Sequence, residues 1–200
     1  MAKIGMRKPR VYPFASSMNG VIPDSGEVTY ESSSVSLGKA VSGTLNENRT
    51  SSDLYADDSM AEHVEDFTGG TFEVTVDDLD PETRGKVLGA SVSVVEASEG
   101  EVGYGADDTP PYMGYGFIEV KRKGGTTSYV GHFFPAVKGS PASQSWTTKG
   151  ENITFNTETI TFTVMPLNTE GRRWHFVRKF TSESASEAWI NSKAGITVGG

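Results

Sequence analysis

The sequence has no cysteine and no long apolar run, and each absence excludes a class of protein. Without cysteine the chain has no disulfide, no thiol nucleophile and no thiolate metal site. Because no apolar stretch approaches the roughly 18 residues of a membrane-spanning helix, we expect a soluble protein with no membrane partner. Residues 1–14 are positively charged but lack the apolar segment and cleavage site of a secretory signal, so we expect folding in a cytoplasm.

Motifs for catalysis and for cofactor binding are also missing. The three histidines, His63, His132 and His175, lie far apart in the sequence, and none belongs to an H-E-x-x-H zinc motif. No serine lies in a G-x-S-x-G elbow, and no glycine-rich segment matches a nucleotide-binding fingerprint. We therefore expect no catalytic residue, no cofactor and no metal. An enzyme that uses two of the many carboxylates is the remaining alternative.

The net charge of −8 is unevenly distributed along the chain. Residues 1–10 hold four basic residues and no acid, whereas residues 53–108 hold sixteen acids against Arg84 and Lys86. Segregated charge favours head-to-tail contact between copies of the chain, and a random surface distribution is the alternative. An acidic chain of this kind does not predict specific binding to nucleic acid, because strong phosphate binding requires a basic surface.

The most acidic stretch is "DLYADDSMAEHVEDFTGG", residues 53–70, in which six carboxylates surround His63 without any Lys or Arg. A calcium loop needs oxygen ligands at regular short spacing and a glycine for its sharp turn, and this stretch lacks both. We interpret residues 46–70 as a long acidic loop exposed to solvent. The contact residues that we predict in it are Asp57, Asp58, Glu62, Glu65 and Asp66.

The dominant hydrophobic period is two, which is typical of β-strands. The segments "TFEVTV" (71–76) and "TITFTV" (159–164) alternate cleanly, so each predicts a strand with one buried face. A further half-buried strand is predicted for "SVSLGKAVSGTL" (34–45). Another is predicted for "RRWHFVRKF" (172–180), where aromatic residues alternate with basic residues and a histidine. We therefore expect one mainly β domain over residues 1–200.

A hairpin is predicted at Gly124-Gly125, which can take the positive φ angles of a two-residue turn. An antiparallel sheet usually buries only one face, but both faces of this hairpin are apolar. We therefore expect a neighbouring subunit to cover the second face. One face carries Ile118, Val120, Tyr129 and Phe133. The other carries Val130 and the three residues that we predict as apolar inter-subunit contacts, Tyr115, Phe117 and Phe134.

Two helices are predicted between the strands. The first has Asp80 as its N-cap, a proline at its first position and Gly89 as its stop, and spans about two turns. The second covers residues 183–194, where Ser184 and Glu187 have the spacing of a capping box. Its apolar stripe should place a tryptophan on the sheet.

Several linked motifs occur in a characteristic order. They are "LGKAVS" (37–42), "LYADDSMAE" (54–62), "FTGGTFEVTVDDL" (67–79), "YGADDTPPYMGYGFI" (104–118), "TKGENITFNT" (148–157) and "AWINSKAGI" (188–196). This order resembles the major tail proteins, or tail-tube proteins, of phages with long non-contractile tails, chiefly those of Gram-positive hosts. The resemblance covers most of the chain.

The resemblance implies an antiparallel β-sandwich or barrel-like tail-tube fold with a flanking helix. It implies a virion protein, made in the bacterial host cytoplasm, whose homohexameric rings stack head-to-tail into a tube for DNA passage. It also implies the tape-measure protein, the tail terminator and the distal tail protein as partners. Some relatives carry an additional immunoglobulin-like domain, and we expect none here. Six copies at −8 each carry −48, so the lumen should let DNA slide without specific binding.

On this interpretation the acidic loop reaches the next ring. Its acids would meet basic groups such as Arg172, Arg173 or the basic segment 1–10. This segment begins an N-terminal arm that we expect over residues 1–34. The alternative is a monomeric β-sandwich module that binds cell-wall carbohydrate, which predicts an exposed platform of aromatic side chains.

Overall fold

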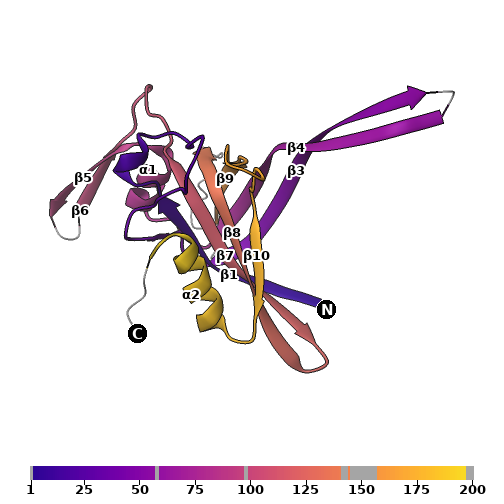
Figure 1. Cartoon of the computed structure of the whole chain (residues 1–200). Coiled ribbons are helices and arrows are strands. Elements are labelled where there is room, and N and C mark those ends of the chain that lie inside the picture. Colours follow the sequence, from indigo (N-terminus) through magenta and orange to yellow (C-terminus); the bar gives the residue numbers. More distant parts are fainter. Residues whose placement is uncertain (1, 57–58, 97–98, 141–143, 145–156, 197–200) are drawn as a thin grey trace.

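Antiparallel strands dominate the computed structural model (Figure 1). It describes residues 2–56, 59–96, 99–140, 144 and 157–196. One eight-stranded sheet has the order β2-β1-β7-β8-β9-β4-β3, with β10 also paired to β8. Its strands are β1 (Ala2–Pro13), β2 (Val35–Ser36), β3 (Ala40–Ala56), β4 (Ser59–Val76), β7 (Tyr112–Lys123), β8 (Thr126–Ser140), β9 (Glu158–Val164) and β10 (Phe176–Phe180).

The other elements flank this sheet. They are the 3-10 turn η1 (Ser16–Met18), the helices α1 (Pro81–Leu88) and α2 (Glu183–Lys193), and a separate hairpin of β5 (Ser91–Glu96) and β6 (Glu99–Gly103). The predicted fold class is confirmed: the chain is mainly β, with one short helix and one helix near the C-terminus. Neither helix in the described part of the chain is long and apolar enough to cross a membrane.

The long strand β8 lies at the centre of the sheet and pairs with three strands. β7 runs along one of its edges. Along the other edge, β10 pairs with residues 129–133 and β9 with residues 137–140. The sheet divides at this point and curves back until β1 and β3 lie close together. A Cβ atom at Gly43 of β3 would lie only 2.7 Å from the Met6 sulfur of β1.

The interior of this curved sheet is filled by the side chains that the period of two predicts. Phe72 of β4 lies opposite Phe162 of β9, and Val74 lies opposite Ile160. All four are buried, which confirms both predicted strands. Burying an apolar side chain of this size stabilises the fold by about 1.5–3 kcal/mol.

The predicted inter-subunit contacts Tyr115, Phe117 and Phe134 also lie in this interior, with exposed fractions of 0%, 8% and 0%. The hairpin register is as predicted, but the conclusion drawn from it is wrong. The second face is covered by α2 of the same chain (Figure 1). The residues between α2 and the sheet are Tyr12, Ile118, Phe133, Ile190 and Ala194.

The ends of the two helices test the caps that the sequence predicts. In α1 the Asp80 carboxylate accepts a hydrogen bond from the Thr83 amide, and Gly89 ends the helix at φ 75°, both as predicted. In α2 the N-cap is Ser182, whose hydroxyl accepts from the Ala185 amide at 3.2 Å, so the predicted capping box at Ser184 is wrong. The helix itself spans Glu183–Lys193, close to the predicted bounds 183–194, and only its cap lies two residues before Ser184.

The predicted strand over residues 34–45 is broken in two. Gly38 has φ 98°, and a Cβ there would lie 2.4 Å from the Asp78 carbonyl oxygen, so the chain bends where only glycine fits. The bend changes which face is buried: Leu37 is 0% exposed, whereas Val41 is 58% exposed. The predicted N-terminal arm over residues 1–34 is also wrong, because residues 2–13 are the strand β1 between β2 and β7.

Candidate assembly interface

Residues 46–56 and 59–70 form the outer half of a two-stranded ribbon that projects from the body (Figure 1). β3 and β4 pair from Ala40 opposite Val76 out to Ala56 opposite Ser59. β9 pairs with β4 only at residues 70–76, so the described residues provide no third strand further out. The predicted loop is therefore wrong, because the backbone groups of the two strands satisfy each other. Residues 46–70 are termed the acidic ribbon below.

The acidic ribbon carries seven acids against Arg49, a net charge of −6. Of the predicted contact residues, Asp57 and Asp58 lie outside the described residues. The other three are exposed on β4: Glu62, Glu65 and Asp66. They are spread over both faces of the ribbon, so its charge is available from either side.

One face of the acidic ribbon also exposes apolar side chains. Leu54 is 59% exposed and Val64 is 49% exposed. The pairing places them on the same face as Glu62 and Asp66. On the opposite face, His63 of β4 contacts the carboxylate of Asp53, its pairing partner on β3. A projecting ribbon with exposed apolar and acidic side chains is a surface suited to contact with another molecule.

The base of the ribbon is fixed by an aromatic contact. The Phe67 ring of β4 stacks on the Trp174 ring, with centroids 4.1 Å apart and planes 9° apart. Beyond this point the two strands have only each other, and an isolated two-stranded hairpin is marginally stable in water. The ribbon is therefore expected to gain its full stability from a partner surface.

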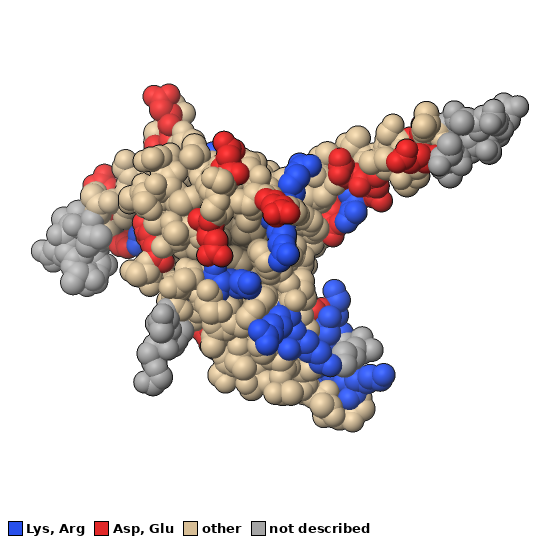
Figure 2. All heavy atoms as spheres, in the orientation of Figure 1, with Lys and Arg blue, Asp and Glu red and all other residues tan. Residues whose placement is uncertain are grey.

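Basic side chains gather at a different end of the body, around the tip of the β7–β8 hairpin (Figure 2). The strand pairings place six bases there, with Glu119 as the single acid, for a net charge of +5. Two of the six contact Glu119, and no other ion pair of these bases occurs among the described residues. This basic end consists of Lys3, Lys121, Arg122, Lys123, Arg178 and Lys179.

The predicted basic contacts lie elsewhere. Arg172 and Arg173 are exposed in the turn before β10, next to the base of the ribbon, and neither forms an ion pair within the described residues. Both side chains are therefore available to a neighbouring molecule, although they lie at the base of the acidic ribbon of their own chain. Sequence reasoning missed the basic end because its members come from three segments that only the sheet brings together.

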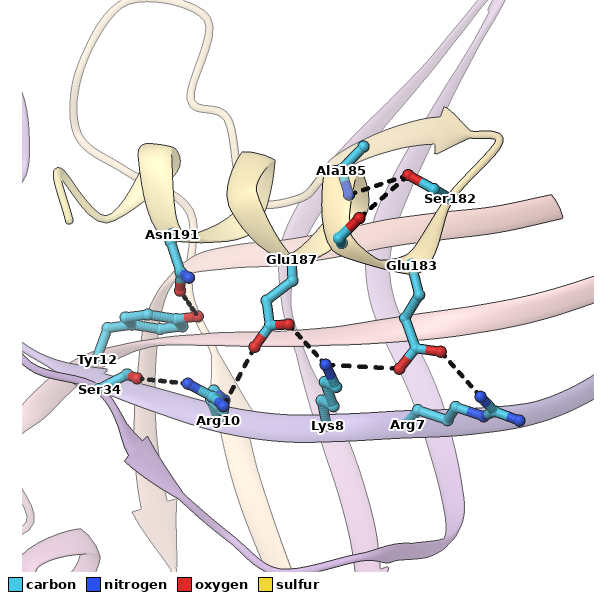
Figure 3. Close-up of polar contacts among 11 residues, drawn as sticks. Arg7, Lys8, Arg10, Tyr12, Ser34, Ser182, Glu183, Ala185, Glu187 and Asn191 are labelled. Carbon is cyan, nitrogen blue, oxygen red and sulfur yellow. Dashed lines mark hydrogen bonds and ion pairs between the residues drawn. The ribbon is translucent and has the colours of Figure 1, made fainter. Parts of the chain in front are cut away.

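The bases near the N-terminus are instead paired within the chain, in a charged clamp between β1 and α2 (Figure 3). Arg7 lies 2.8 Å from Glu183, and Lys8 lies 2.6 Å from Glu187, which also contacts Arg10 at 3.2 Å. A bulge in β1 with Lys8 at φ 51° turns these neighbouring side chains to one side. These basic side chains are therefore neutralised within their own chain, without the expected contact with the acids of a neighbouring subunit.

The clamp is expected to stabilise the docked helix only weakly. We predict that Glu187→Gln lowers the free energy of unfolding by about 0–1 kcal/mol, because these ion pairs are partly exposed and solvent screens them. Ile190→Ala, which empties a site that is 4% exposed, should cost about 2–5 kcal/mol. Urea unfolding of both variants measures the two costs. A larger cost for Glu187→Gln would show that charge, and not apolar contact, holds α2.

The strands also bring together two histidines that the sequence analysis treated as unrelated. His132 of β8 contacts both Glu119 of β7 and His175, which lies immediately before β10. The predicted hairpin register already placed His132 two positions from Glu119, but nothing local indicated the approach of His175. In the described part of the chain, no group of three or more His, Cys, Asp or Glu is arranged to hold a metal ion.

Comparison with known proteins adds no family to this description: no protein-family model matches the chain, and no curated protein is significantly similar to it.

Proposed function

We propose that the protein is the structural subunit of a phage tail tube, in which homohexameric rings stack head-to-tail. The observation that supports it most directly is the pairing of a projecting ribbon of charge −6 with a basic end of charge +5 on the same chain. Two complementary surfaces at different places on one molecule generate head-to-tail assembly, because each copy offers what the next one binds.

In this assembly the acidic ribbon of one subunit lies on the basic end of a subunit in the next ring. Each exposed ion pair contributes only about 0–1 kcal/mol, so the charges set the register. Leu54 and Val64 supply the apolar area that an exposed ion pair does not. Arg172 and Arg173, next to the base of the ribbon of their own chain, provide further cations for the acidic ribbon of a neighbouring subunit.

The motif order that resembles major tail proteins supports the same proposal and supplies the ring and the lumen. The tape-measure, terminator and distal tail proteins remain the partners that this resemblance implies. A negatively charged lumen repels the DNA phosphates, so DNA would pass without specific binding. The proposal requires no catalytic residue and no cofactor.

The alternative, a monomeric module that binds carbohydrate, predicts an exposed aromatic platform. Among the most exposed large hydrophobic residues of the described chain, Tyr104 is the one aromatic residue, at 56%. The other six are aliphatic. This distribution favours the structural subunit over the carbohydrate module.

Electron microscopy of negatively stained, concentrated protein tests the proposal. Rings or tubes are the expected result. A uniform population of 21.5 kDa monomers at every concentration and salt condition would contradict it.

The same material provides a salt prediction. Raising the salt concentration from about 0.1 M to 1 M shortens the screening length from about 10 Å to 3 Å. Stacking between rings, which we assign to exposed charges, should weaken more than closure of each ring. Sedimentation should therefore show tubes giving way to rings, and tubes that are indifferent to salt would argue against the ribbon contact.

A further inference from the structure

The contacts of His132 and His175 form a complete hydrogen-bond chain when both rings are neutral. His132 Nε2 lies 3.3 Å from Glu119 Oε2, and its Nδ1 lies 3.0 Å from His175 Nε2. Because the carboxylate can only accept, His132 donates from Nε2, which leaves Nδ1 to accept from His175. One hydrogen therefore lies between the two rings. A second hydrogen there would break the chain.

An aromatic ring packs on each histidine of this pair. Phe117 stacks on His132 with centroids 4.6 Å apart, and Phe134 stacks on His175 at 4.2 Å. Burial lowers the pKa of His132 below its ordinary value. Burial, and then the charge of His132, lower the pKa of His175 to about 4. Both rings are thus neutral at pH 7.

The charged groups that face the pair come from two neighbouring strands. Lys121 and Glu119 lie on β7, and Lys3 lies on β1. Burial would raise the pKa of Glu119, but hydrogen bonds from Lys121, Lys3 and His132 outweigh it and lower the pKa. The carboxylate is therefore already balanced by two ammonium groups 2.8 and 3.2 Å away, and it offers little compensation to a charged imidazole.

The pair is connected to the base of the acidic ribbon. Trp174 is the residue before His175, and its ring contacts both the His175 ring, at 5.3 Å, and the Phe134 ring, at 6.2 Å. The Trp174 ring also stacks on the Phe67 ring of the acidic ribbon. Moving His175 out of its site would therefore move Trp174 with it.

We propose that the His132–His175 pair is an acid-sensitive latch that holds Trp174, and through it the base of the acidic ribbon, in position. Protonation of both rings places two cations in contact and directs two N–H groups at each other, so the rings separate. The stack of Trp174 on Phe67 is then released. The consequence for assembly rests on the proposed function, whereas the latch itself is a property of the single chain.

The direction of the pH effect follows from the difference between the folded and unfolded states. Unfolded histidine titrates near pH 6.5, and His175 titrates near 4 in the folded chain. The stabilisation is therefore complete above pH 6.5 and is lost as the pH falls toward 4. Protonation of His175 in the unfolded state lowers the folding constant by up to tenfold per pH unit in this range, and the lowered pKa of His132 acts in the same direction.

Amide hydrogen exchange on dilute, monomeric protein tests the latch at pH 7.5 and 4.5, after correction for the intrinsic exchange rate. In the wild type, protection around Phe67 and in β10 should fall at least tenfold at the lower pH, while protection in β9 changes less. His175→Phe keeps an aromatic ring against Phe134 but cannot titrate, so its protection should change less than threefold. His63→Gln, which removes the exposed histidine of the ribbon, should respond as the wild type does.

Equal acid responses of His175→Phe and the wild type would overturn the latch. If His175→Phe does not fold, a histidine titration of the wild type by NMR decides the matter. Both rings titrating near 6.5 would overturn the proposal, and depressed values for both would support it. Because every measurement uses single chains, a failure to form tubes would contradict the proposed function and leave the latch standing.

Discussion

Replacing Glu62, Glu65 and Asp66 with lysine is expected to abolish the stacking of rings into tubes. The three carboxylates are exposed on β4 of the acidic ribbon, so the substitutions leave the body of the fold untouched. In the proposed assembly, each change replaces an attraction to the basic end with a repulsion. The monomer should remain folded, which far-ultraviolet circular dichroism checks, while electron microscopy and sedimentation report the loss of tubes.

The expected effect is large because the small free energy of each ion pair is repeated many times in the assembly. An exposed ion pair contributes about 0–1 kcal/mol. In the proposed hexameric ring, three positions in each of six ribbons at one junction together reach on the order of 10 kcal/mol by the same estimate. A loss of this size shifts the assembly equilibrium by several orders of magnitude, since about 1.4 kcal/mol corresponds to a factor of ten.

Two further variants separate the specific contact from a general charge effect. Lysine at three exposed acids outside the ribbon changes the net charge equally and should leave tubes intact; the acids are Glu27, Glu31 and Asp107. Glutamate at Arg122, Lys123 and Lys179, combined with the ribbon substitutions, exchanges the two signs at the substituted positions and so restores the attraction between them. Tubes should return in this combined variant. If they do not, while the control assembles normally, the ribbon does not bind the basic end.

Phe134→Ala is expected to lower the free energy of unfolding of the single chain by about 3–5 kcal/mol. The Phe134 side chain is 0% exposed, and its ring lies 4.2 Å from His175 and 5.6 Å from Phe72. Truncation therefore leaves a cavity among rings that belong to different strands and cannot collapse together. This loss is a large fraction of the 5–15 kcal/mol that typically stabilises a domain.

Urea unfolding at a protein concentration below that of assembly measures this cost without contributions from neighbours. Val177→Ala on β10 is the matched control: the side chain is 53% exposed, so truncation should change the stability by less than about 0.5 kcal/mol. A small cost for Phe134→Ala in the single chain, with a large one in the assembled form, would return Phe134 to the role of an inter-subunit contact that the sequence predicted.

The outcome at the β7–β8 hairpin shows how far sequence patterns extend. The glycine pair at its tip predicts the register, and alternation predicts which side chains share a face, because both depend on residues adjacent in the chain. That both faces are apolar was also correct. The pattern does not say what covers the second face. A helix that follows some fifty residues later in the chain and a neighbouring subunit present the same kind of surface to it.

The histidine pair and the charged clamp show the same limit. Their members are separated by 43 residues and by 176 or more residues, respectively, and no spacing in the sequence relates them. The acidic ribbon was missed for a different reason. Its many carboxylates indicate solvent exposure correctly, but a strand whose two faces are both exposed has no hydrophobic alternation to reveal it.

The amino-acid sequence by itself therefore determined the strand segments with a buried face, the hairpin turn, the caps of α1 and the separation of acidic from basic segments. These depend on backbone conformations and hydrophobic periods that a few neighbouring residues set. The tertiary structure alone decided that α2 covers β7 and β8, that β1 pairs its bases with α2, and that His175 meets His132. Each of these is a contact between distant segments, and its free energy depends on which surfaces the rest of the fold leaves uncovered.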